Sequence, residues 1–541
     1  MSGMPHLVIA PVLLPMAAAA VMLLMGGASR AKAAVSVLAA AAGLAVAVAL
    51  CTRTIAGEGT DAIGVYLPSN WDVPFGIVLV VDRLSAFMLV IAAIVGLAAI
   101  VFSVARWDRA GPHFHSLAQL QLMGLNGAFL TADVFNLFVF FEIALAASYA
   151  LLFHGSGRAR VGAGLHYLAI NLLASSFFLI GVAVLYGITG TLNMADIAAK
   201  LPQVPQADRG LLHAGAAILG LAFLAKAAMW PLNSWLAPAY TGAAPPVAAL
   251  FVLLTKLGIY AALRTWSLLV STEPGETEAF GGTALAYGGL ATIAFGSLAM
   301  LGVQQLRRLA AYAVIVSSGT LLAAIGFAHA ALAGAALLYL AVSTLGTAAL
   351  FLLAELVERS RTGAPASIMF DEEADTRPIY VAALDPRGEL PSTDEVPVGR
   401  AIPGTMAFLG LSFMACALLV AGLPPLSGFL AKFALLAALL EAPLPAMRAA
   451  GWTFFTFLIA SGLLSTVVLS RAGIRYFWAP QGRSAPAVRW VEGIPIGALL
   501  AAAIALTVFA EPVLEYGRAA ASSLFAPTSY VEAVLSARPV P

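Results

Sequence analysis

Long apolar segments separated by short polar stretches run through almost the whole chain. A helix that crosses the hydrocarbon core of a bilayer needs about 20 mostly apolar residues. Measured against that length, the sequence holds about fourteen such segments. They begin near residues 5, 33, 80, 114, 134, 163, 211, 242, 282, 308, 330, 403, 449 and 492. The pattern predicts an all-α protein that crosses the membrane many times.

Composition supports a lipid surrounding. Of the 541 residues, 61% are hydrophobic and 10% are charged, whereas soluble domains carry about 25% charged residues. The formal net charge of +1 and the lack of a basic cluster speak against a nucleic-acid partner. The two cysteines, Cys51 and Cys416, lie in apolar runs, so we expect small buried side chains and not a disulfide. No metal or cofactor motif is visible, and we expect neither group.

Basic residues predict how the chain is oriented. In membrane proteins, lysine and arginine collect in cytoplasmic loops. An outer N-terminus puts most of them inside, among them Arg106, Arg307 and Arg489, and leaves few outside, among them Arg264. Both termini are then extracytoplasmic. The first apolar stretch lacks a basic leader and is too long for a cleaved signal peptide. Residues 358–402, rich in Asp, Glu, Arg and Pro, predict an irregular loop outside the membrane.

Charged residues inside the apolar segments are the candidate functional groups. They are Glu142, Lys226, Lys256 and Lys432. Each such charge near a helix centre costs about 2.5–3.5 kcal/mol on insertion scales. In a structural interpretation, Glu142 pairs with one lysine and the other lysines extend to the membrane surface. In the functional interpretation, which we favour, the four form a proton relay, because burial and a nearby carboxylate shift the proton affinity of a lysine in opposite directions.

Prolines interrupt two of the helices that carry these lysines. Pro231 follows Lys226 by five residues, and Pro424 and Pro425 precede Lys432 by about two turns. Proline removes a backbone hydrogen bond, and in lipid the freed groups need protein or water around them. Broken spans that bear a charge point to inverted repeats with ion sites near the membrane midplane.

Two histidines are weaker candidates. His329 lies between two predicted helices, where it could titrate near neutral pH, although a capping or loop role explains it as well. His166 opens a predicted helix and could line an entry, or it could anchor the helix at the membrane interface. Both stay accessory candidates.

Three stretches carry a resemblance to the antiporter-like family that Mrp-type sodium/proton antiporter complexes share with respiratory complex I. They read GLNGAFLTADVFNLFVFFEIALAASYALLFHG, LAFLAKAAMWPLNSWLAPAYTGAAPPVAALFVLLTKLGIYAALR and LPPLSGFLAKF. Within the family, the chain most resembles the D-type branch of Mrp subunits. The resemblance implies fourteen helices with two inverted five-helix repeats, helices 4–8 and 9–13, and broken helices 7 and 12. The implied divisions are residues 1–113, 114–266, 267–480 and 481–541. It also places the family's functional residues at Glu142, Lys226, Lys256 and Lys432.

The chain departs from many relatives between the last two lysines. Helix 11 reads AVSTLGTAALF, with Ser343 and Thr347 where relatives carry a histidine and a lysine. Helix 10 has Ser317 and Ser318 in place of a longer Ser-Ser-Ile-Ser-Gln run. We therefore expect protons between Lys256 and Lys432 to depend on hydroxyls and water.

The resemblance implies a proton-translocating subunit of a multisubunit Na⁺/H⁺ antiporter in the bacterial inner membrane. The implied partners are the other Mrp subunits, of the types A, B, C, E, F and G, the lipid bilayer, protons and Na⁺, and the chain is a secondary transporter component, not an enzyme. Two alternatives remain open. One is a proton-pumping subunit of a quinone-linked NADH dehydrogenase-type complex, against which the sequence shows neither a long lateral helix nor a cofactor motif. The other is a non-conducting scaffold, against which the four charged positions are all present.

Overall fold

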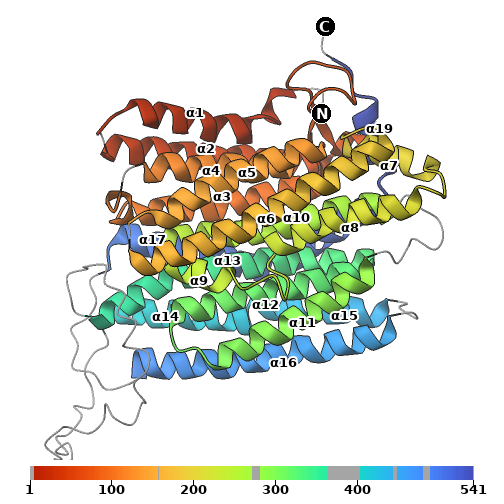
Figure 1. Ribbon diagram of the computed structural model, residues 1–541. Helices are drawn as coiled ribbons and strands as arrows, with labels where there is room; N and C mark the ends of the chain where they lie inside the picture. The colour runs from red at the N-terminus through yellow and green to blue at the C-terminus, as the bar shows by residue number, and fades with distance from the viewer. Residues whose placement is uncertain are drawn as a thin grey trace, which may run out of the picture.

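A computed structural model describes residues 5–27, 29–111, 113–155, 157–270, 281–362, 403–442, 447–478 and 488–539. Within these ranges the protein is a bundle of helices that run roughly parallel or antiparallel to one another (Figure 1). The helices are α1 (Ala10–Leu24), α2 (Ser29–Ala56), α3 (Arg83–Ser103), α4 (Phe114–Leu130), α5 (Val134–Phe153), α6 (Arg158–Thr189), α7 (Met194–Lys200), α8 (Arg209–Lys226), α9 (Leu236–Gly242), α10 (Pro245–Val270), α11 (Gly282–Leu301), α12 (Leu306–Gly326), α13 (Ala330–Thr362), α14 (Gly404–Ala421), α15 (Ser427–Glu441), α16 (Arg448–Gly473), α17 (Trp490–Val508), α18 (Ala510–Phe525) and α19 (Thr528–Leu535).

These helices confirm the predicted polytopic all-α architecture. Each predicted apolar segment contains a helix that begins within a few residues of the expected position. Of the described helices, 12 are long and apolar enough to cross a membrane, and α1 is a shorter apolar helix. The predicted start of the polar loop was wrong, because α13 continues to Thr362 and holds Glu358 and Arg359 in its last turns. Both side chains are ion-paired to other helices. The rest of that loop lies outside the described residues.

A short hairpin precedes α3. Strand β1 (Gly64–Tyr66) pairs antiparallel with β2 (Leu79–Val81), with Val65 opposite Val80. The next residue, Asp82, caps α3: its carboxylate accepts from the Ser85 backbone N–H, and the Ser85 hydroxyl accepts from the Asp82 N–H. This reciprocal capping box satisfies two backbone donors at the helix start.

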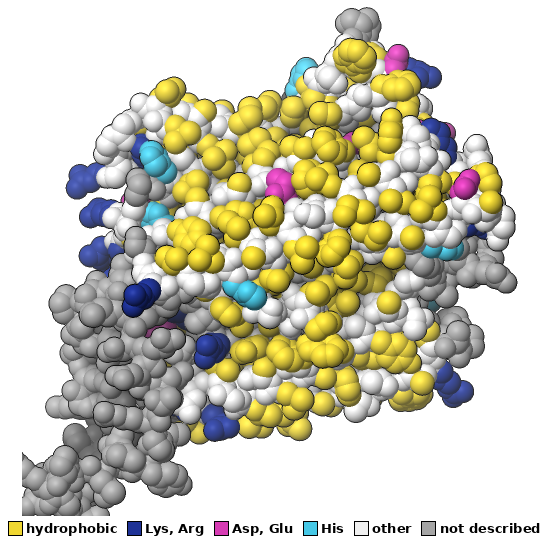
Figure 2. Space-filling model, viewed as in Figure 1, with side chains coloured by type: hydrophobic (Ala, Val, Ile, Leu, Met, Phe, Trp, Pro, Cys, Tyr) yellow, Lys and Arg dark blue, Asp and Glu magenta, His cyan; other side chains and the backbone are white. Residues whose placement is uncertain are grey.

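The centre of the bundle is formed by α10, α12 and α13. The membrane-length window of α10 is entirely buried, and those of α12 and α13 are nearly so. The outer helices leave apolar side chains on the molecular surface, and Figure 2 shows hydrophobic groups across the middle of one face with Lys and Arg toward its ends. An apolar exterior of this kind is suited to contact with lipid or with neighbouring membrane subunits.

Two crossings are interrupted, as the prolines predicted. One runs through α8 and α9 with a non-helical stretch at residues 227–235, and the other runs through α14 and α15 with a break at residues 422–426. In the first break, the indole N–H of Trp235 donates to the Ala225 carbonyl, and the Trp230 backbone N–H donates to the Thr292 hydroxyl. These bonds supply the partners that backbone groups need in a water-poor interior.

Candidate proton-transfer site

Glu142, Ser175 and Lys226 form a polar cluster where α5, α6 and α8 meet. Lys226, the last residue of α8, donates to the Ser175 hydroxyl at 3.2 Å, and that hydroxyl donates to Oε1 of Glu142. The direct distance between Lys226 Nζ and Glu142 Oε1 is 3.9 Å. The Lys226 side chain is buried, whereas that of Glu142 is 33% exposed. The cluster therefore joins a carboxylate at the edge of the bundle to an amine in its interior.

Two phenylalanines, Phe141 and Phe223, pack beside this cluster. The Lys226 ammonium lies 5.1 Å from the centre of the Phe141 ring, which in turn stacks on Phe223. A cation over an aromatic face gains about 0.5–2 kcal/mol, more when it is desolvated. Both rings are buried, and Ser175 and Glu142 are the polar neighbours of the lysine.

Lys256 lies in the middle of α10 and is completely buried. Its ammonium donates to the Ser317 hydroxyl of α12 at 2.5 Å, and Ser317 donates in turn to the Val314 carbonyl at 2.8 Å. Within the described ranges Lys256 forms no ion pair. The structure thus brings together Lys256 and Ser317, which the sequence named separately.

Lys432 lies on α15, beside the second helix break. Its ammonium donates to the Ala421 carbonyl, the last of α14, at 2.9 Å. Gly422 ends α14 with φ of 75°, and a Cβ at this position would lie 2.5 Å from Cδ of Lys432. A Cβ on Gly462 would lie 3.3 Å from its Nζ. Two glycines therefore make the space that the lysine occupies.

The hydroxyls between Lys256 and Lys432 bond mainly to their own helices. Ser343 donates to the Leu340 carbonyl, and Thr347 donates to that of Ser343. The Ser318 hydroxyl is buried, with no hydrogen-bond partner among the described residues. These groups do not join the two lysines by direct hydrogen bonds in the described part of the chain.

Among the described residues, no hydrogen bond or ion pair joins the two histidines to the four charged residues. His329 lies between α12 and α13, and its Nδ1 is buried without a hydrogen-bond partner in the described ranges. His166 is exposed on α6 and lies 3.2 Å from the Ser234 hydroxyl in the first helix break. Within the described residues, His, Cys, Asp and Glu form no group of three or more that could hold a metal ion.

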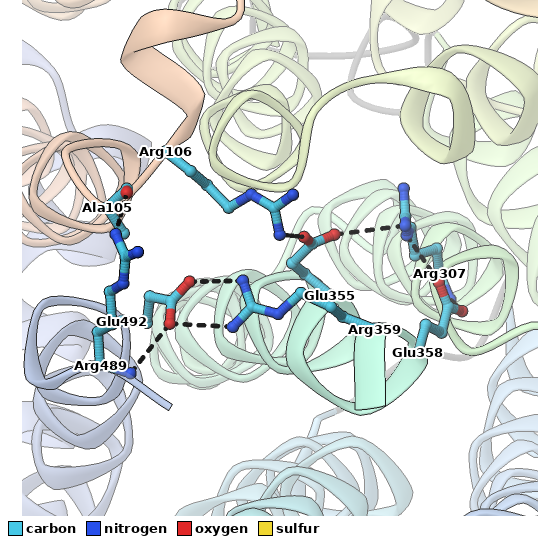
Figure 3. A network of polar contacts seen from close by, with 8 residues as sticks. All are labelled: Ala105, Arg106, Arg307, Glu355, Glu358, Arg359, Arg489 and Glu492. Carbon is cyan, nitrogen blue, oxygen red and sulfur yellow. Dashed lines mark hydrogen bonds and ion pairs between the residues drawn. The ribbon is translucent and has the colours of Figure 1, made fainter. Parts of the chain in front are cut away.

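Sequence reasoning missed an ion-pair network around the last turns of α13 (Figure 3). Glu355 lies between Arg106 and Arg307 at 3.5 and 3.4 Å, and Arg307 also pairs with Glu358 at 2.8 Å. Arg359 and Glu492 form a two-point pair at 2.7 and 3.0 Å. The network ties the end of α3 and the starts of α12 and α17 to the last turns of α13. The sequence identified these arginines only as loop charges.

A buried ion pair lies at the opposite end of the bundle. Arg264, which the sequence placed in an outer loop, lies on α10 and donates to the Asp82 carboxylate at 2.7 Å. Its guanidinium also lies over the rings of Tyr260 and Tyr530. Burial raises the pKa of Asp82, but the Arg264 charge and hydrogen bonds outweigh it and hold that pKa below its ordinary value. The pair joins α3, α10 and the C-terminal α19.

Comparison with known proteins agrees with this architecture. The family described as "NADH:quinone oxidoreductase/Mrp antiporter, TM" matches residues 131–386. The D subunit of a probable K(+)/H(+) antiporter from Rhizobium meliloti (strain 1021) is 50% identical, over 98% of this chain and 98% of its own length. The D subunit of the Na(+)/H(+) antiporter from Alkalihalophilus pseudofirmus is 34% identical over 98% and 100%. A chain in the Mrp complex of Dietzia sp. DQ12-45-1b superposes with a TM-score of 0.82 at 26% identity, covering 99% and 100%.

Fold and comparisons together define a multi-pass membrane protein of the ion-transport class. The chain belongs to the family that comprises the D subunits of Mrp antiporters and the antiporter-like membrane subunits of complex I. It is thus a transporter component and not an enzyme, and the predicted family is confirmed.

Proposed function

We propose that this chain translocates protons as the D subunit of a multisubunit monovalent cation/proton antiporter, by way of Glu142, Lys226, Lys256 and Lys432. The observation that carries the proposal is the contact of Glu142 and Lys226 through Ser175, beside the first helix break. Lys256 and Lys432 are two further buried amines, and Lys432 lies on α15, beside the second break.

A buried lysine beside a carboxylate can take up and release a proton in a controlled way. A buried lysine favours its neutral form, and a nearby carboxylate favours its charged form. Changing the distance between the two therefore changes when the lysine releases its proton. One unit of proton affinity corresponds to about 1.36 kcal/mol, and a membrane potential supplies about 2.3 kcal/mol per charge per 100 mV. The two energies are comparable, so cation movement elsewhere in the complex can drive proton release.

The exchanged cation is K⁺ in this proposal, with Na⁺ as the alternative. The family resemblance in the sequence predicted Na⁺. The relative at 50% identity is a component of a probable K(+)/H(+) antiporter, whereas the relative from a Na(+)/H(+) antiporter is 34% identical. The greater identity supports K⁺ for this chain.

The complex and its orientation are also proposals. We infer partners of the A, B, C, E, F and G types and a place in the bacterial inner membrane. The two termini lie at the same end of the bundle, and α13 ends at the other end (Figure 1). The arginine-rich network around the last turns of α13 supports a cytoplasmic position for that end of the bundle and extracytoplasmic termini. The inverted repeats of helices 4–8 and 9–13, and the four divisions of the chain, stay predictions.

The alternatives make different predictions. A subunit of a quinone-linked complex requires quinone reduction by NADH to copurify with this chain. A scaffold requires that the charged residues be replaceable without loss of exchange.

Exchange in inside-out vesicles that contain the assembled complex tests the proposal. A proton gradient is set up by respiration, and its collapse is followed after K⁺ or Na⁺ is added. We expect Lys226→Ala, Lys256→Ala and Lys432→Ala each to abolish the collapse while the complex still assembles. Wild-type exchange in all three variants would support the scaffold. A faster collapse with Na⁺ than with K⁺ would reverse the cation assignment alone.

A further inference from the structure

Ser175 lies between the two charged members of the cluster. It is near the middle of α6 and only 4% exposed. Its hydroxyl oxygen accepts from Lys226 at 3.2 Å, and its hydrogen is donated to Glu142. Nothing in the sequence marked this residue, because a serine in an apolar helix is not unusual.

Among the described residues, the hydroxyl of Ser175 is the only group that forms hydrogen bonds with both Glu142 and Lys226. Nitrogen and oxygen atoms form hydrogen bonds at about 2.7–3.2 Å, and the two charged groups are 3.9 Å apart. An ammonium only donates and a carboxylate only accepts, whereas a hydroxyl does both at once. Ser175 therefore completes a connected donor–acceptor chain that the ion pair alone does not form.

Two other serines, one next to Ser175 in the chain and one beside Lys256, use their hydrogens differently. Ser176, the next residue, is exposed and donates to the Leu172 carbonyl of its own helix. Ser317 also accepts from a lysine, but it donates to the Val314 carbonyl. Serine hydroxyls inside helices commonly bond back in this way. Ser175 instead directs its hydrogen to a carboxylate on another helix, which is the geometry of proton transfer.

We propose that Ser175 is a positioning residue that holds Glu142 and Lys226 in register and passes a proton between them. This inference rests on the proposed function. In the transfer, an N–H bond of Lys226 breaks as an O–H bond forms at Ser175. The original O–H bond of Ser175 breaks as an O–H bond forms at Glu142. Both partners end neutral, the hydroxyl is regenerated, and the reverse transfer restores the ion pair.

Exchange in vesicles that contain the assembled complex tests this role, with the pH profile as the readout. We expect Ser175→Ala to lower the exchange rate about tenfold or more. We also expect the pH profile of exchange to differ from that of the wild type, because the connected donor–acceptor chain between Lys226 and Glu142 is broken. Ser175→Thr keeps the hydroxyl and restores most of the rate. Ser176→Ala is the matched control and leaves both rate and profile unchanged.

Two further variants keep the outcomes distinct. Ser175→Cys replaces the hydroxyl by a slightly larger thiol, which is a weak donor. This variant is used if the alanine variant fails to assemble. Profiles of Ser175→Ala or Ser175→Cys that superimpose on wild type overturn the inference, as does equal loss in the threonine and alanine variants. The Glu142→Gln variant distinguishes failure of the proposed function from failure of the proposed role of Ser175. If it keeps full exchange, the proposed function fails, whereas if it is inactive and Ser175→Ala is normal, only the role of Ser175 fails.

Discussion

The ammonium nitrogen of Lys432 lies 2.9 Å from the carbonyl oxygen of Ala421, the last residue of α14. Lys226 is itself the last residue of α8. In both interrupted crossings, a lysine thus lies at the C-terminal end of a half-helix. Aligned peptide dipoles give such an end a partial negative charge, which stabilises a cation by about 0.3–2 kcal/mol. For Lys432, whose ammonium contacts the last carbonyl of α14, the helix break therefore offsets part of the cost of placing the charge in the membrane.

Gly422 shapes the Lys432 site, so its replacement should disturb the lysine. Gly422→Ala forces a side chain into left-handed backbone and places a Cβ 2.5 Å from Cδ of Lys432. We expect a loss of about 1–3 kcal/mol in stability and reduced exchange. Thermal unfolding of the purified complex measures the first effect. Gly410→Ala on the same helix is the control, because its Cβ would meet only Phe477 at 3.9 Å. Equal melting temperatures for the two variants would contradict the account.

Neighbouring serines on α12 should differ in their effect on exchange. Ser317 accepts a hydrogen bond from Lys256, whereas the Ser318 hydroxyl is buried without a partner in the described ranges. Ser317→Ala leaves the lysine without that acceptor, and we expect exchange to fall about tenfold. Ser318→Ala removes an unsatisfied group and should be neutral or slightly stabilising. Exchange rates in vesicles with matched amounts of complex compare the two. A larger loss in the Ser318 variant would sink this assignment.

The pair of Arg359 and Glu492 should stabilise the contact between α13 and α17. Glu492 is buried and Arg359 is about one-quarter exposed. Glu492→Ala removes a two-point ion pair, and we expect a loss of about 1–3 kcal/mol. Asp196→Asn is the control, since the Asp196–Lys200 pair is a more exposed i,i+4 contact within one helix worth about 0.3–0.5 kcal/mol. Both are compared by thermal unfolding, and similar shifts would argue against a stabilising network.

The Asp82–Arg264 pair makes stability depend on pH. Because its folded-state pKa is below the ordinary value, the contribution of Asp82 is fully present above about pH 4 and is lost as pH falls through the folded-state value. Asp82→Asn leaves Arg264 buried and uncompensated, which costs about 3–5 kcal/mol near pH 7. Melting temperatures measured from pH 7 downward should converge for variant and wild type under acid conditions. A constant difference across this range would be incompatible with the assignment.

Sequence predicted the helices well because the signal for a membrane crossing is local. A run of about 20 apolar residues is sufficient evidence of a crossing. The beginning of each run also predicted where its helix begins. Glu142, Lys226, Lys256 and Lys432 were found because each is an anomaly within such a run. The prolines located the breaks for a similar reason, since their effect acts on their own helix.

Contacts between helices were not predictable in the same way. The sequence did not show which lysine lies near Glu142, and it gave no reason to select Ser175. The extension of α13 beyond residue 358 was missed because its polar residues resemble a loop until their partners on α12 and α17 are known. Arg264 looked like a loop residue for the same reason, since its partner Asp82 lies 182 positions away.

The pH profile of cation-dependent proton exchange by Glu142→Gln tests the central claim most directly. The assembled complex in inside-out vesicles is compared with wild type at equal protein content over a range of pH. If Glu142 controls the proton affinity of Lys226, exchange is abolished or its profile is displaced, because the carboxylate charge 3.9 Å from the lysine is gone. A profile with the wild-type rate and the wild-type midpoint would contradict the relay.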